Sequence, residues 1–131
     1  MITAADLRKI ARARLKDSEI LYREHRYDGA VYLCGYTIEL VLKAKICRTL
    51  KWSGFPTTRA EFEGLQSFRI HKLDMLLHLS GMEAKIKTNF FADWPIVATW
   101  DPESRYRSTG SATRLGAQNM IESTKVLLGA I

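Results

Sequence analysis

A nearly uncharged stretch at residues 29–42 is the feature that most constrains how this chain can fold. Glu39 is its only charged residue, and its apolar side chains are spread around a helix instead of gathering on one face. A helix that is apolar all round is buried among other elements. The stretch is also shorter than the roughly 20 residues that cross a bilayer, so we expect a central helix and no membrane anchor.

Helical signals on the N-terminal side of this stretch predict its first neighbour. Thr3 and Asp6 form a capping box, and apolar residues then recur at helical spacing to about residue 25. Asp28 is a suitable N-cap for the central helix, which we expect to end near Lys51, where its last turn becomes basic. Two long helices joined by a short turn follow from this pattern.

The second half of the chain is more broken. Glycines and a proline in residues 52–68 predict a long, partly ordered loop, and Pro102 predicts irregular structure over residues 100–108. Between and after these segments the apolar spacing predicts shorter helices. We expect one at residues 71–79, which Gly81 ends, and a second at residues 82–89. A third follows from residue 94 after a cap at Asp93, and the last runs from about residue 111 to residue 131.

Composition narrows the class further. The 131 residues fit one domain over residues 1–131, and 47% hydrophobic with 26% charged residues excludes disordered and collagen-like chains. Only 3 Pro and 8 Gly argue against an all-β protein rich in turns. The predicted fold is therefore all-α, an antiparallel up-and-down bundle of four to five helices.

Charge points to a class of partner. The net charge is +6, and the residues up to 51 hold 11 Lys or Arg against 6 Asp or Glu. A basic N-terminal half suits polyanions, although many basic proteins of this size bind none. The alternative is a module whose charge only keeps it soluble.

Cysteine usage indicates a cytoplasmic protein. Cys34 and Cys47 are expected on one helix, about 20 Å apart, which is beyond the reach of a disulfide. The first residues lack the cationic start and apolar run of a signal peptide. A reducing compartment is the setting that these features favour.

Several templates of catalysis and cofactor binding are missing. The chain has no GxGxxG or GxxxxGK phosphate loop, no HExxH or zinc-type Cys/His spacing, and no GxSxG elbow. We therefore expect no metal and no cofactor.

Two groups of residues are candidates for contact with an anion or a nucleotide. Arg69 and His71 precede a predicted helix, whose N-terminus favours negative charge. Arg105, Tyr106 and Arg107 place two guanidinium groups around an aromatic ring, which suits phosphate contact and base stacking. The alternatives are that His71 caps or packs at the helix start, and that the tripeptide anchors an ordinary loop. If anions bind, we expect one site that combines the two groups.

Glu39 is the one ionisable residue expected in the core. A buried carboxylate needs a partner, and Lys43 lies one helical turn later on the same face. A structural Glu39–Lys43 pair in a buried polar core is the first interpretation. The alternative is a place in a polar cluster that faces a ligand.

The order of these motifs resembles a known family. Residues 27–47 read YDGAVYLCGYTIELVLKAKIC, and after a loop residues 71–81 read HKLDMLLHLSG. A Tyr- and Ala-rich second helix with an E-x-x-x-K-A core, then an H-x-L start to the third helix, resembles a prokaryotic HEPN domain. The resemblance continues through residues 100–107, WDPESRYR, and covers most of the chain.

The resemblance implies a helical bundle, commonly a homodimer, with a role tied to nucleotides or RNA. Many members are metal-independent endoribonuclease toxins, and others are partners of minimal nucleotidyltransferases. The nuclease members carry an Arg, four to six residues and then a His on a late helix. None of His25, His71 and His78 has an Arg at that distance, and the last predicted helix has no His.

The expected function is therefore binding without catalysis. The ligand would be a nucleotide, RNA or a protein partner such as a minimal nucleotidyltransferase, in a system of the toxin–antitoxin type. The alternative is a divergent metal-independent endoribonuclease that uses His71 with Arg69 or Arg105.

Overall fold

The computed structural model describes residues 1–131 and contains α-helices and two short 3₁₀ helices, with no strand beyond one isolated bridge. The α-helices are α1 (Ala4–Arg23), α2 (Tyr27–Thr49), α3 (Leu73–Ser80), α4 (Glu83–Asn89), α5 (Trp94–Ala98) and α6 (Arg114–Ala130). The 3₁₀ helices are η1 (Gln66–Phe68) and η2 (Pro102–Tyr106). The predicted all-α class is confirmed, with six helices in place of four to five because the region after Gly81 divides into separate short helices.

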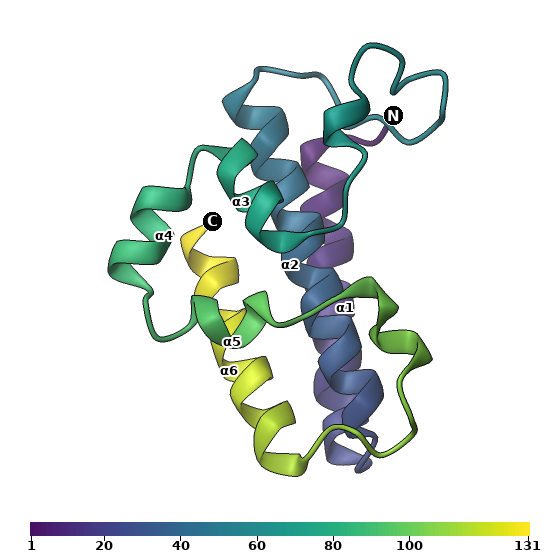
Figure 1. Cartoon of the computed structure of the whole chain (residues 1–131), viewed down its shortest axis with the longest axis vertical. Helices are drawn as coiled ribbons and strands as arrows, with labels where there is room; N and C mark the ends of the chain where they lie inside the picture. Colours follow the sequence, from purple (N-terminus) through teal and green to yellow (C-terminus); the bar gives the residue numbers. More distant parts are fainter.

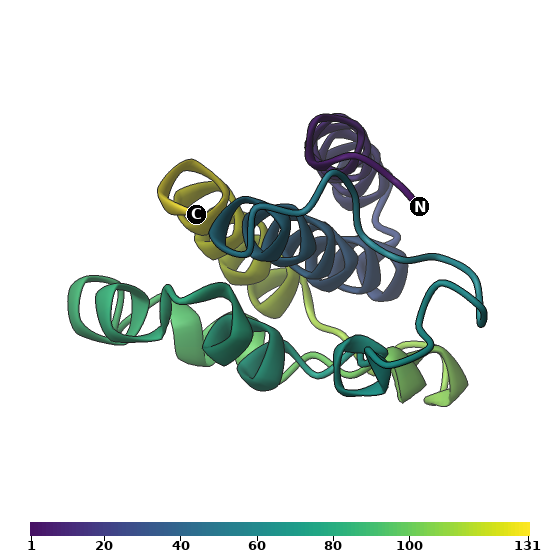
Figure 2. The same ribbon diagram turned by 90° about the horizontal axis from the view of Figure 1, so that it is seen from above.

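The three long helices carry the architecture. α1 and α2 form an antiparallel hairpin along the longest axis, and α6 runs beside α2 (Figure 1). Seen from above, α2 lies between α1 on one side and the short helices α3, α4 and α5 on the other (Figure 2). α2 is therefore the central helix.

The burial of α2 follows from its sequence. Cys34, Ile38 and Leu42 have no exposed surface, and the small residues Ala30 and Ala44 are equally buried. Small side chains let the neighbouring helices approach closely at these positions. No helix of the structure is both long enough and apolar enough to span a bilayer.

Capping residues set several helix ends. The Thr3 side chain accepts a hydrogen bond from the backbone N–H of Asp6 at 3.1 Å and begins α1, as the capping box predicts. Thr113 accepts from the N–H of Gly116 at 3.0 Å and begins α6, three residues later than expected. Gly81, with a φ of 77°, ends α3 in the left-handed conformation that glycine favours.

One predicted cap is wrong, and a second caps its helix by position only. Arg26, not Asp28, occupies the N-cap position of α2, because the carboxylate of Asp28 is used elsewhere and accepts the backbone N–H groups of Gly110 and Ala112. Asp93 does occupy the N-cap position of α5, but its side chain makes no capping hydrogen bond and instead accepts one from the Ser123 hydroxyl at 3.0 Å. In both cases a contact distant in sequence takes the carboxylate from the adjacent helix.

The long loop after α2 is more ordered than the sequence predicts. Phe55 pairs with Ile2 through two backbone hydrogen bonds of 2.9 and 2.7 Å, and Phe55 and Phe62 are buried. The ring of Trp52 lies 4.8 Å from that of Phe68 in η1. Burial of these aromatic side chains holds the loop against the bundle.

Candidate functional site

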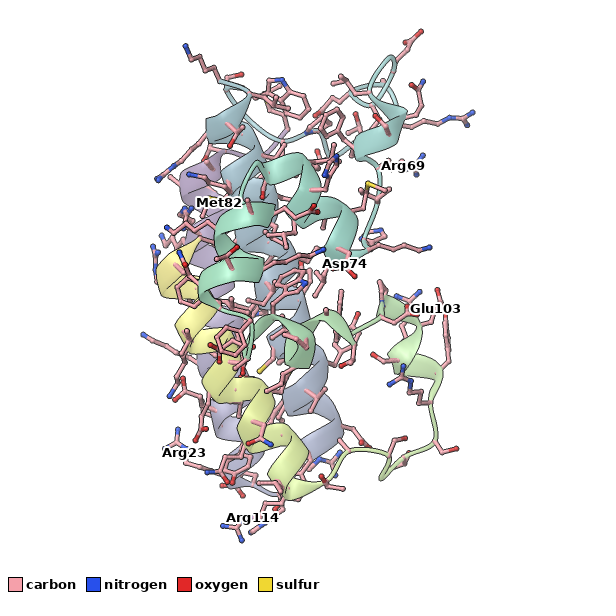
Figure 3. All side chains as sticks on the ribbon, turned by 60° about the vertical axis from the view of Figure 1, so that its left-hand side comes forward. Arg23, Arg69, Asp74, Met82, Glu103 and Arg114 are labelled. Carbon is pink, nitrogen blue, oxygen red and sulfur yellow. The ribbon has the colours of Figure 1, made fainter.

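A cleft of about 820 Å³ lies beside the N-terminal half of α2. Its walls come from α2, α5, the first turns of α6 and the segment of residues 104–113. Figure 3 shows this segment running from Glu103 down the side of the bundle to Arg114 at the start of α6. The volume lies within the range of about 300–1,000 Å³ that is typical of small-molecule sites.

The cleft combines an apolar part with a polar and cationic part. Val31, Ile96 and Met120 contribute apolar surface. The segment opposite contributes the guanidinium groups of Arg105 and Arg107 and several hydroxyl groups. Neither guanidinium forms an ion pair within the protein. The lining therefore offers hydrogen-bond donors and positive charge next to an apolar surface.

Asp28 fixes the segment that carries these groups. Its carboxylate accepts the backbone N–H of Gly110 at 2.6 Å and that of Ala112 at 2.8 Å. These two bonds are the main reason that the pKa of Asp28 is lowered from its ordinary value. Gly110 has a φ of 86°, which a side chain would disfavour, so the chain turns there to present its amide to Asp28.

Arg105 is held at the mouth of the cleft by aromatic neighbours. Its guanidinium carbon lies 4.9 Å from the centre of the Tyr106 ring, and the hydroxyls of Tyr106 and Tyr32 raise the pKa of Arg105. Tyr32 lines the cleft, whereas Tyr106 does not and is 72% exposed. Tyr106 therefore orients Arg105 from outside the cleft.

The carboxylate of Glu39 forms a second polar cluster, away from the cleft. Glu39 is 3% exposed, and its Oε1 lies 2.7 Å from Nζ of Lys43 and 2.6 Å from Nδ1 of His71. The ammonium group of Lys43 also lies over the ring of Phe55, 5.4 Å from its centre. The sequence predicts the Lys43 partner, but it does not predict that His71 closes the cluster from the loop.

The predicted role of His71 as a helix cap is wrong. Lys72 occupies the N-cap position of α3, which begins at Leu73, and the imidazole of His71 turns toward Glu39 instead. A buried carboxylate attracts the nearest donor more strongly than an exposed helix end does. The side chain of His71 is 61% exposed, so the cluster borders on solvent on the side of the imidazole.

The structure does not bring the two predicted anion-binding groups together. Arg105 and Arg107 line the cleft, whereas Arg69 and His71 do not. Arg69 lies over the ring of Phe62 instead, 5.9 Å from its centre. Arg105 lies near Tyr32 of α2, whereas His71 binds Glu39. Residues 32 and 39 are about 10 Å apart along the helix axis.

Two further features of the site escape sequence reasoning. Asp28 acts through residues more than eighty positions away, which no local pattern indicates. Tyr32 is one of many apolar residues in the central helix, and only its neighbours in the fold place it on the cleft. No three His, Cys, Asp or Glu side chains converge as metal ligands would.

Comparison with protein families gives one match. Residues 4–60 match the family model described as HEPN domain. Searches of curated proteins and of solved structures found no match. The matched residues cover α1, α2 and the start of the following loop, so they include Asp28, Tyr32, Glu39 and Lys43 but not Arg105 and Arg107.

Proposed function

Because residues 4–60 match the HEPN domain family model, we propose that this helical protein is HEPN-like and binds, without catalysis, the phosphate group of a nucleotide or of RNA in the cleft. The observation that carries the proposal is the pair Arg105 and Arg107, two guanidinium groups without acidic partners on one wall of a cleft of ligand size. Arginine matches phosphate because its planar fork donates two parallel hydrogen bonds.

The surroundings of the pair support the same ligand. Asp28 is the only acidic residue that lines the cleft, and two backbone amides already occupy its carboxylate. The N-terminus of α6 lies at the cleft, where Thr113 and Gly116 line it, and the positive end of a helix favours an anion. The apolar surface of Val31 and Ile96 gives a nucleobase or ribose a place to pack.

Binding of AMP and of a short labelled RNA to the purified protein tests the proposal. We expect Arg105→Ala to weaken binding about tenfold, the loss typical of one phosphate-binding arginine. Lys9→Ala is the matched control, since Lys9 is an exposed cation on α1 outside the cleft. Tyr106→Ala should give a smaller loss than Arg105→Ala, because Tyr106 only orients that guanidinium. Equal losses from Arg105→Ala and Lys9→Ala, with the fold intact by circular dichroism, would refute the cleft as the site.

One observation favours a second candidate, a metal-independent endoribonuclease. Glu39 holds Nδ1 of His71, whose side chain is 61% exposed, and a carboxylate bound to one ring nitrogen can orient a histidine for proton transfer through the other. Incubating labelled RNA with the protein in EDTA tests this candidate. Cleavage that His71→Ala abolishes would support it, whereas intact RNA after incubation would leave binding as the function.

The proposal extends to partners and setting. A homodimer is the assembly that the family resemblance favours, and a nucleotidyltransferase in a toxin–antitoxin type of system is a protein partner to test by co-purification. Phe91, Tyr106 and Leu115 are 74%, 72% and 66% exposed, so apolar surface remains for such contacts. Cys34 and Cys47 are both buried free thiols, which suits the reducing cytoplasm.

A further inference from the structure

We infer that the cleft continues into a second subsite, formed by His25, Arg26 and Tyr27, and that the two together bind consecutive nucleotides of a single strand. This inference rests on the proposed function, because it takes the Arg105 and Arg107 wall as the first phosphate site. It adds a set of residues from the turn between α1 and α2, and it distinguishes a strand from a mononucleotide as the ligand.

The continuity of the two cavities is the first argument. A second cavity of about 260 Å³ adjoins the cleft, and the two share Asp28, Gly29, Thr109 and Ala112 as lining residues. The shared residues surround the two hydrogen bonds that the Asp28 carboxylate accepts from the backbone N–H groups of Gly110 and Ala112, which we call the Asp28 clamp. One groove therefore passes the clamp and reaches the turn between α1 and α2.

The charges along the groove are the second argument. Arg105 and Arg107 line its first part, and Arg26 lines its second part. Arg26 is exposed and forms no ion pair in the protein. Arg23 and Arg114 lie at the same end of the bundle (Figure 3), where with Arg26 they outnumber the acids Glu24 and Asp28. Cations at both ends of a groove match a ligand that carries more than one phosphate.

Aromatic surface in the second subsite is the third argument. Tyr27 lines it, and its hydroxyl lies 2.8 Å from Nδ1 of His25. The turn is fixed by backbone bonds from His25 to Tyr22 at 3.0 Å and from Arg26 to Leu21 at 2.8 Å. The tyrosine ring is therefore held in place before a ligand arrives, and nucleobases stack on such rings without regard to sequence.

The length of the groove agrees with this ligand. Residues 26 and 32, which line its two parts, are about 9 Å apart along the axis of α2. Successive nucleotides of a stacked strand rise by about 3.4 Å. The groove is thus longer than one nucleotide needs.

The test compares the dinucleotide pApA with AMP by isothermal titration or fluorescence. We expect wild-type protein to bind pApA about tenfold more tightly than AMP, because a second phosphate contact and a second stacked base together are worth at least about a factor of ten. Arg26→Gln should remove most of this advantage while AMP binding stays unchanged. Arg23→Gln is the matched control, an exposed arginine of the same turn region that lines neither cavity.

The salt dependence gives a second readout. Arg26→Gln should lower the slope of log K against log salt for pApA by about 0.7, the value for one phosphate contact on a single strand. Equal affinities of wild-type protein for pApA and AMP, or the same loss for both ligands in Arg26→Gln, would overturn the inference. No effect of Arg105→Ala on AMP would instead refute the proposed function. If the deoxy dinucleotide binds as tightly as pApA, the result would support the inference and would show that the strand can be DNA as well as RNA.

Discussion

The indole ring of Trp100 lies directly against the backbone of Gly35 in the middle of α2. A Cβ atom at position 35 would sit 2.0 Å from Cγ of Trp100, far inside the contact distance of two carbon atoms. Tyr32, one turn earlier on α2, packs against the same indole at 5.9 Å and lines the cleft. Trp100 can therefore occupy this position only because residue 35 is a glycine. Through its contact with Tyr32, the indole supports one wall of the cleft.

Gly35→Ala is expected to destabilise the protein by about 1–3 kcal/mol, since the added methyl group forces the buried indole to move. Urea unfolding measures the change. Gly129→Ala is the matched control: its Cβ would meet no atom within 4 Å, so helix propensity alone should stabilise α6 slightly. Equal stabilities of the two variants would contradict the packing described for Trp100.

Glu39→Ala is expected to lower the free energy of unfolding by about 3 kcal/mol, because it leaves the partly buried ammonium of Lys43 without a counter-charge. Thermal unfolding by circular dichroism measures it. Glu122→Ala, which removes an exposed acid of α6, should stay within about 0.5 kcal/mol of the wild type. An unchanged melting temperature in Glu39→Ala would rule out a stabilising role for the cluster.

The clamp at Asp28 predicts a pH dependence with a definite sign. Its pKa is lower in the folded protein than the unfolded value of about 3.9, so the clamp stabilises the fold fully above that value and loses its effect as the pH falls through the folded pKa. The amide NMR signals of Gly110 and Ala112 should shift together with one midpoint below about 3.9. Asp28→Asn should abolish that transition, and its persistence in the variant would assign it to another group.

Light scattering tests the homodimer. Phe91 and Leu115 are 74% and 66% exposed, and the family resemblance favours a homodimer that could cover them, so we expect twice the chain mass of 15.0 kDa at micromolar concentration. Phe91→Ser and Leu115→Ser then show which of the two side chains lies in the interface. A mass of one chain across that range would exclude the dimer.

The sequence predicts the long helices well because their signals are local. The all-round apolar pattern of residues 29–42 identifies the central helix, and Thr3, Gly81 and the spacing of Glu39 and Lys43 act within one turn of a helix. The shorter helices are also found, with ends that differ from the expected ones by at most three residues.

The site is harder to predict, because it depends on contacts between distant residues. Arg105 and Arg107 are identified by their chemistry. The prediction that they share one site with Arg69 and His71 is wrong, because only Arg105 and Arg107 line the cleft. No rule of spacing places His71 on Glu39, which is 32 positions away, or the amide of Gly110 on Asp28. In both cases the further partner comes from a segment distant in sequence, so only the packed chain shows it.

If the cleft binds the proposed ligand, the clamp of Asp28 also determines when during its synthesis the chain acquires that site. The α1–α2 hairpin forms from neighbouring segments and already carries most of the net positive charge, whereas the clamp joins residues 82 and 84 positions apart. Contacts over such separations form late, because a long loop must close first. On the proposed function, a chain still emerging from the ribosome would attract polyanions through its charge alone. We expect saturable binding only after residues 110–112 have joined Asp28, so that the second half of the chain would convert a general attraction into recognition.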